Sequence, residues 1–279
     1  MSEPTVVARD ALAGTRVGFS VSESADLGRL GLTELHCQLV VAEVTRAVLL
    51  AGGTVVYGGR LKPEGYTQIM LEEAQRFQDG TASIEIVLAE TEFQKLTVDE
   101  LDAAQQRLGR LGRIRYILAE GREVPLSALP TTPRTVSPID ALTAMRRIVT
   151  QSTDARVLVG GKLRGYAGRE PGLIEEARLS IEHGAVLYAV AGFGGAAAAV
   201  SLARASSRPA WMPSLFPDAA DTEPVQNAMA SLHASARAPK SAWDGLDDAD
   251  RELLERTHRP ADIATLVVRG LANVGRRRA

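Results

Sequence analysis

Residues 156–183 of the 279-residue chain, RVLVGGKLRGYAGREPGLIEEARLSIEH, join a short apolar run to an amphipathic one through a glycine-rich loop. An apolar run such as Val157–Val159, in the expected strand Arg156–Val159, is typical of a strand that is buried on both faces. A glycine pair and Lys162 follow it, and Pro171-Gly172 precede a segment with apolar residues at helical spacing. The stretch therefore predicts one strand–loop–helix unit of a parallel α/β sheet.

The same alternation continues on both sides of this unit. We expect strands at 15–20, 54–57, 83–88, 114–118, 156–159 and 185–191, and helices from Thr33 to 51 and at 67–78, 97–108, 139–151, 171–183 and 196–205. This order requires a mostly parallel, Rossmann-like sheet with helices on both faces. The segment from Glu120 to Pro138 contains four prolines and predicts a long surface loop.

From Pro209 onward the pattern contains helices only, expected near 225–236, 247–257 and 261–274. We therefore divide the chain into a sheet-containing domain over 1–208 and a helical C-terminal extension over 209–279. The extension either packs on the sheet or docks on a partner protein. Its apolar side chains, such as Leu253 and Leu271, favour packing because they need burial.

Composition excludes several classes of function. The 32 Lys and Arg residues nearly balance the 34 Asp and Glu residues, and aromatic residues make up only 4% of the chain, so we expect neither nucleic-acid nor membrane partners. The single cysteine, Cys37, and four scattered histidines provide no metal-ligand spacing. We expect no metal and no cofactor. The chain contains no leader pattern and no apolar run long enough to cross a membrane, which predicts a cytoplasmic protein.

Glycine clusters follow four of the expected strands: Gly18, Gly58-Gly59, Gly160-Gly161 and Gly192-Phe193-Gly194-Gly195. At the carboxyl ends of parallel strands, glycine lets backbone amides approach a phosphate, and the next helix presents its positive end. Tight turns alone also explain single glycines. Lys162, and more weakly Arg60, follow the glycine pairs and favour a phosphate role.

Two further motifs bear on the ligand. Gly192, Gly194 and Ala197 fit the dinucleotide pattern G-x-G-x-x-G/A, but no strand ending in an acidic residue follows, so a classical NAD site is not expected. Glu175 and Glu176 begin a helix. They either act as favourable charge at its N-terminus, or accept ribose hydroxyls, or act as nucleophile or base at C1′ of a nucleotide.

These segments together resemble the SLOG superfamily, a Rossmann-like group that includes LOG enzymes, DprA proteins and the sensor domains of Thoeris antiphage systems. The resemblance covers roughly residues 15–205 and rests on the following segments: Gly18–Ser24, Tyr57-Gly58-Gly59, Met145-Arg146, Gly160-Gly161-Lys162, Pro171–Ala177 and Gly192–Gly195. The chain is most similar to the Thoeris-type branch, whose domains bind a cyclic ADP-ribose isomer.

The resemblance implies that Arg146 and Lys162 hold phosphates, that Glu175 or Glu176 binds ribose hydroxyls, and that the Gly194-Gly195 amides help to enclose the ligand. Nothing outside the SLOG-like region resembles an NAD-cleaving module, so the implied output is either through a separate effector protein or through the domain itself. A homo-oligomer is implied as well. The LOG signature P-G-G-x-G-T-x-x-E is incomplete here, because only Pro171-Gly172 and the glutamates match it.

We therefore predict a nucleotide or ADP-ribose-type ligand. Its expected binding residues are Gly18, Ser20, Ser22, Gly58, Gly59, Arg60, Arg146, Gly160, Gly161, Lys162, Gly172, Glu175, Glu176, Gly192, Phe193, Gly194 and Gly195. The alternative is an N-glycosidase of the LOG type, in which Glu175 or Glu176 would be catalytic.

Overall fold

The computed structural model of the chain describes residues 7–77, 83–130, 132, 134–205, 207–213, 216–218, 222–236 and 244–278. Within these residues one seven-stranded sheet has the order β5-β4-β3-β2-β1-β6-β7. The strands are β1 (Arg16–Ser22), β2 (Thr54–Gly58), β3 (Ser83–Ala89), β4 (Gly112–Ile117), β5 (Glu123–Val124), β6 (Ala155–Gly160) and β7 (Val186–Val190).

The six strands expected from the sequence are all present and pair in parallel, which confirms the fold class. The short strand β5 was not predicted. It pairs antiparallel with β4 inside the proline-rich segment that we expected to be a loop. Two residues are too few to produce an alternating pattern, so the sequence carries no signal for this strand.

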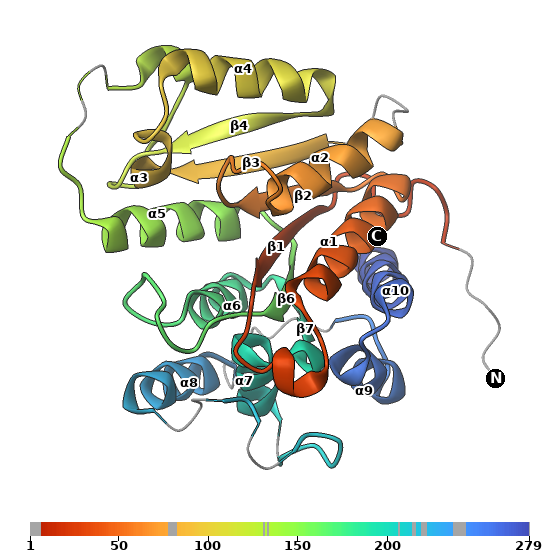
Figure 1. The fold of residues 1–279 in the computed structure, drawn as a ribbon. Helices are drawn as coiled ribbons and strands as arrows, with labels where there is room; N and C mark the ends of the chain where they lie inside the picture. The colour runs from red at the N-terminus through yellow and green to blue at the C-terminus, as the bar shows by residue number, and fades with distance from the viewer. Residues whose placement is uncertain are drawn as a thin grey trace.

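Helices cover both faces of the sheet (Figure 1). On one face lie α1 (Glu34–Leu50), α2 (Tyr66–Arg76), α4 (Val98–Leu108), α9 (Asp248–Arg256) and α10 (Pro260–Arg278). On the other lie α5 (Pro138–Gln151), α6 (Gly172–His183), α7 (Gly195–Arg204) and α8 (Glu223–Ala236). A one-turn helix, α3 (Glu90–Phe93), directly follows β3. The end expected for α2, at Gln78, lies outside the described residues.

Local sequence explains where several helices begin. Thr97 precedes α4, where its hydroxyl accepts the backbone N–H of Glu100 at 3.2 Å and Glu100 Oε2 accepts the N–H of Thr97 at 2.7 Å. This reciprocal pair is a capping box and satisfies two amides that have no partner inside the helix. Ser137 caps α5 in a similar way, with Pro138 at the first helical position.

The strand order places β1 at the point where the chain changes direction across the sheet. β1 pairs with β2 on one side, Gly18 opposite Val56, and with β6 on the other, Ser22 opposite Gly160. The chain builds the sheet outward from β1 to β4 and then returns to add β6 and β7 beyond β1. Loops after β1 and β6 therefore leave the sheet in opposite directions, and this divergence opens a crevice at the strands' carboxyl ends.

Strand alternation separates two kinds of residue on β1. Val17, Phe19 and Val21 pack in the core beneath α1 and α10. Gly18, Ser20 and Ser22 project toward the opposite face, the one covered by α5 and α6, because successive side chains of a strand point to opposite sides. β1 therefore contributes a polar, small-residue stripe beside the crevice.

The C-terminal helices pack on the sheet domain. Ile263 and Val267 of α10 are fully buried in the same apolar core as Val40 and Val44 of α1. Figure 1 shows α10 beside α1, with the C-terminus at the end of this pair. Of the two alternatives for this segment, the structure favours packing on the sheet. None of the helices in the described ranges is both long and apolar enough to cross a membrane.

We predict that Leu271→Ala lowers the free energy of unfolding by about 2–5 kcal/mol, since Leu271 of α10 is only 4% exposed and its loss leaves a cavity. Leu35→Ala is the matched control, because Leu35 of α1 is 58% exposed, and it should change stability by less than about 0.5 kcal/mol. Urea unfolding of both variants measures the difference. Equal losses would contradict the packing of α10.

Candidate functional site

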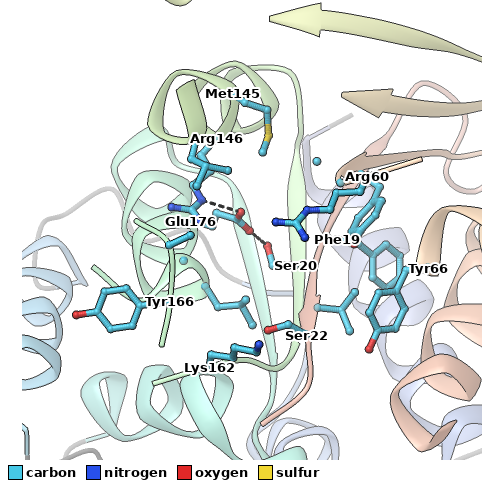
Figure 2. A pocket seen from close by; sticks show the side chains of 18 of the residues that line it. Phe19, Ser20, Ser22, Arg60, Tyr66, Met145, Arg146, Lys162, Tyr166 and Glu176 are labelled. Atoms are coloured by element: carbon cyan, nitrogen blue, oxygen red, sulfur yellow. Dashed lines mark hydrogen bonds and ion pairs between the residues drawn. The ribbon is translucent and has the colours of Figure 1, made fainter. Parts of the chain in front are cut away.

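A cavity of about 480 Å³ lies at the carboxyl ends of β1, β2 and β6, where the strand order changes direction. Ser20 and Ser22 of β1 and Gly58 of β2 form part of its wall. Met145 and Arg146 of α5, and Glu176 of α6, approach from one face of the sheet, and Tyr66 of α2 from the other (Figure 2). Its volume lies within the range that holds small ligands.

Glu176 is the centre of a charged network at the floor of this cavity. Its Oε2 accepts hydrogen bonds from the Ser20 hydroxyl and from Arg156 Nη1, the latter at 3.2 Å. Its Oε1 lies 3.3 Å from Arg146 Nε. The carboxylate is thus held between two guanidinium groups, and Figure 2 shows it directed toward Ser20.

Arg156 lies beneath the cavity and is only 1% exposed. Its guanidinium donates to Ser180 Oγ at 2.8 Å, Ser20 Oγ at 2.9 Å and Thr150 Oγ1 at 3.0 Å. Burial lowers the pKa of this guanidinium, and the nearby Glu176 carboxylate raises it in part. A buried charge of this kind requires a partner of opposite sign, and Glu176 provides it.

Gly18 makes room for Arg156. A Cβ atom at Gly18 would lie 3.5 Å from Arg156 Cζ and 3.4 Å from Thr153 Cγ2, so even a methyl group would be in van der Waals contact with both side chains. Gly18 is not among the residues that line the cavity, and its contact with a ligand stays a prediction. Sequence reasoning missed Arg156, although an arginine at the start of an otherwise apolar buried strand is an unusual feature that could have identified it.

The two neighbouring glutamates have different surroundings. Glu175 is buried and accepts hydrogen bonds from Arg146 Nη1 and from Thr143 Oγ1, the latter at 2.9 Å. It does not line the cavity, whereas Glu176 does. Because consecutive residues of a helix point about 100° apart, only Glu176 faces a ligand in the cavity.

The cations around the cavity also differ. Arg60 is bound to Glu92 at 3.2 Å, and Arg146 is bound to both glutamates of α6. Lys162 is exposed and forms no ion pair or side-chain hydrogen bond with the residues that the structure describes. In Figure 2 its amino group points toward Ser22.

Two tyrosines form an aromatic side of the cavity. The rings of Tyr57 and Tyr66 meet edge to face, with centroids 6.5 Å apart. Burial raises the pKa of both phenols above the ordinary value, so both stay protonated at neutral pH. The two rings suit a planar aromatic group such as a nucleotide base.

The glycines before α7 do not open into this cavity. The Gly195 N–H donates to Asp26 Oδ2 at 2.8 Å, and the Asp218 N–H donates to Asp26 Oδ1 at 2.9 Å. Asp26 is 1% exposed. The positive end of α7 is therefore already neutralised by a carboxylate of the chain itself, to which the first amide of the helix donates.

The structure brings together part of the expected set of ligand-binding residues. Nine of them line the cavity: Ser20, Ser22, Gly58, Gly59, Arg60, Arg146, Lys162, Gly172 and Glu176. The others lie outside it: Gly18, Gly160, Gly161, Glu175, Gly192, Phe193, Gly194 and Gly195. Direct contact of either group with a ligand stays a prediction. Within the described part of the chain, no three His, Cys, Asp or Glu side chains are placed to hold a metal ion.

The fold and the cavity define a doubly wound α/β protein with a cavity at its topological switch point, where proteins of this class bind ligands. A family model described as SLOG cluster2 matches residues 11–241, and the chain therefore belongs to the SLOG cluster2 family. Membership suggests a nucleotide-related function. No curated protein and no solved structure matches the chain. The matched region extends past residue 208 and includes α8, so the boundary drawn there stays a prediction.

We predict that Glu176→Ala lowers the free energy of unfolding by about 3–5 kcal/mol, because it leaves Arg156 buried without a carboxylate. Glu182→Ala on the same helix is the control. Its side chain is 45% exposed and pairs with Arg178 at the surface, so its loss should cost no more than about 1 kcal/mol. Thermal and urea unfolding of the two variants measure these losses of stability. Equal losses of stability in Glu176→Ala and Glu182→Ala would contradict the buried network.

Proposed function

We propose that the chain binds a nucleotide in this cavity and senses a nucleotide derived from NAD or ADP-ribose, including cyclic forms. The observation that carries the proposal is the pairing of charges across the cavity. Lys162 is a cation without a partner among the described residues, and Glu176 is a carboxylate held rigidly at the floor. A sugar-phosphate offers the complement of both, an anion and hydroxyl donors.

In this proposal the phosphate binds Lys162 and the backbone at the start of α6, near Gly172. The N-terminus of α6 faces the cavity and favours negative charge. The ribose hydroxyls donate to Glu176, whose orientation is set by Arg146, Arg156 and Ser20. The base lies toward Tyr57 and Tyr66.

The surroundings of Glu176 support binding over cleavage. Both of its oxygens already face cations, and the Ser20 hydroxyl donates to one of them. A carboxylate engaged in this way is a good, fixed acceptor and a poor nucleophile, because its lone pairs and charge are shared with neighbours. The sensor acts in the cytoplasm in this proposal, assembles as a homo-oligomer, and passes its output to a separate effector protein.

We predict that Lys162→Ala weakens nucleotide binding by about 1.5–3 kcal/mol, the typical value of a charge-assisted hydrogen bond. Calorimetry with AMP, ADP-ribose, NAD and cyclic ADP-ribose isomers measures the effect. Arg147→Ala is the control, since Arg147 is exposed on α5 outside this cavity and its loss removes the same charge. Absence of heat from every nucleotide with the wild-type protein would reject the proposal.

A second candidate is an N-glycosidase, favoured by the presence of the Glu176 carboxylate in the cavity. Glu176 would act at C1′, so that water replaces the base and releases it with a ribose phosphate. Chromatography of nucleotides after incubation with wild type and Glu176→Gln separates the two functions. We expect no free base from either protein. Release by wild type alone would establish the enzyme and overturn the pure sensor.

A further inference from the structure

A separate cavity of about 530 Å³, which we name the α9 cavity, lies beyond the carboxyl end of β7. Its walls come mainly from Gly192 in the turn after β7, from the segment between α7 and α8, and from the connection between α9 and α10. It shares no lining residue with the cavity at the ends of β1, β2 and β6. Its volume lies within the range that holds small ligands.

Contacts around Gly192 fix one wall of the α9 cavity. His258 Nε2 donates to the Gly192 carbonyl oxygen at 2.7 Å, and the His258 ring meets the Phe193 ring edge to face, with centroids 5.6 Å apart. A Cβ atom at Gly192 would lie 2.8 Å from the carbonyl oxygen of Arg256, which is closer than such atoms normally approach, so this packing requires glycine. The connection between α9 and α10 is thereby held against the end of β7.

Apolar side chains form a large part of the lining, which includes Leu30, Trp211, Pro213, Phe216 and Leu253. Arg208 donates to the carbonyl oxygens of Pro213 and Phe216 at 2.9 and 2.8 Å, and these bonds hold the segment in place. Two of the five apolar residues are aromatic, although aromatic residues make up only 4% of the chain. Rings gain additional energy from edge or offset contacts with another ring, so this lining favours a ligand with an aromatic body.

The ionisable side chains among the described lining residues are all basic: Arg256, His258 and Arg259. Arg256 Nη1 lies 3.8 Å from Glu252 Oε1, a long ion pair in which both side chains are more than half exposed. Arg259 is exposed and pairs with no carboxylate in the described part of the chain, including Asp262 in the first turn of α10. Because Arg256 shares its charge with Glu252, the unbalanced charge lies at Arg259, and a single carboxylate would balance it.

The helix ends at this cavity do not change that balance. α9 presents its negative C-terminal end and α10 its positive N-terminal end at the same connection, so their fields oppose each other. The lining also differs from that of the cavity at β1, where the Glu176 carboxylate offers an acceptor for sugar hydroxyls. No carboxylate belongs to the described lining of the α9 cavity, so a sugar has no comparable acceptor there.

We propose that the α9 cavity is a second ligand site and that its ligand is a small aromatic carboxylic acid. The ring packs against Trp211 and Phe216, and the carboxylate binds the guanidinium of Arg259. A guanidinium presents parallel N–H donors that match the two oxygens of a carboxylate. A nucleotide is disfavoured, because its phosphate carries more charge than Arg259 balances and its ribose lacks a carboxylate acceptor. The site is independent of the nucleotide binding proposed above.

The test is calorimetry on the full-length protein with naphthoate and with naphthamide, a neutral probe of nearly the same shape. We expect naphthoate to bind about tenfold more tightly, because only the carboxylate makes a charge-assisted bond to Arg259. Arg259→Ala should remove this preference and leave naphthamide unchanged. Arg107→Ala is the control, since Arg107 is exposed on α4, lines neither cavity and carries the same charge. It should change neither affinity.

Two further measurements locate the probe. Trp211→Leu keeps an apolar side chain but removes a ring, so it should weaken both probes by the same factor. Excess AMP should leave the affinity for naphthoate unchanged, because the two cavities share no lining residue. Thermal melting checks that each variant is folded.

Several results would overturn the second site. These are an absence of heat from naphthoate with the wild-type protein, equal affinity for the two probes, and a preference for naphthoate that persists in Arg259→Ala. Unchanged affinities in Trp211→Leu would remove the aromatic wall from the site and overturn the proposal as well. Displacement of naphthoate by AMP would place the probe in the cavity at β1 instead. None of these results bears on whether that cavity binds a nucleotide, which its own calorimetry decides.

Discussion

The ion pair between Arg156 and Glu176 is the constraint on which the rest of the site depends. A guanidinium inside an α/β sheet is tolerated only when a carboxylate and hydrogen-bond acceptors surround it. Ser20 of β1, Thr150 of α5 and Ser180 of α6 provide those acceptors, so the pair joins the elements on both sides of the switch point. The polar floor of the cavity is thereby continuous with the buried centre of the sheet, and its geometry is as rigid as the fold.

The need to neutralise charge inside the protein also explains why the glycine-rich loops before α6 and α7 have different surroundings. The positive end of α7 is neutralised by Asp26, and Gly194, with a positive φ of 73°, packs directly against that side chain. The end of α6 instead faces the open cavity beside Arg146. The two helix starts thus differ because the Gly195 amide of α7 donates to Asp26, whereas Gly172 at the start of α6 lines the open cavity. In the proposed function, this difference directs the phosphate of the ligand to α6 and to Lys162.

The fold could be predicted well from the sequence because its signals are local. Apolar runs of strand length alternate with helical periodicity, and this alone requires parallel pairing and two covered faces. The exceptions were short or weakly patterned, as in β5 and α3. The sequence left two alternatives for α10. An apolar helix face indicates that the helix must be buried, but it does not indicate which surface buries it.

For the site, the sequence by itself determined the residue types: glycines after strands, a lysine after a glycine pair, and two adjacent glutamates at a helix start. Only the tertiary structure decided which of them meet. It directed Glu176 into the cavity and Glu175 away from it, placed Asp26 at the start of α7, and buried Arg156 beneath Ser20. These choices depend on contacts between residues as much as 169 positions apart. Sequence periodicity indicates on which face of a helix or strand a residue lies. Which distant residue it contacts depends on how the elements pack in the folded chain.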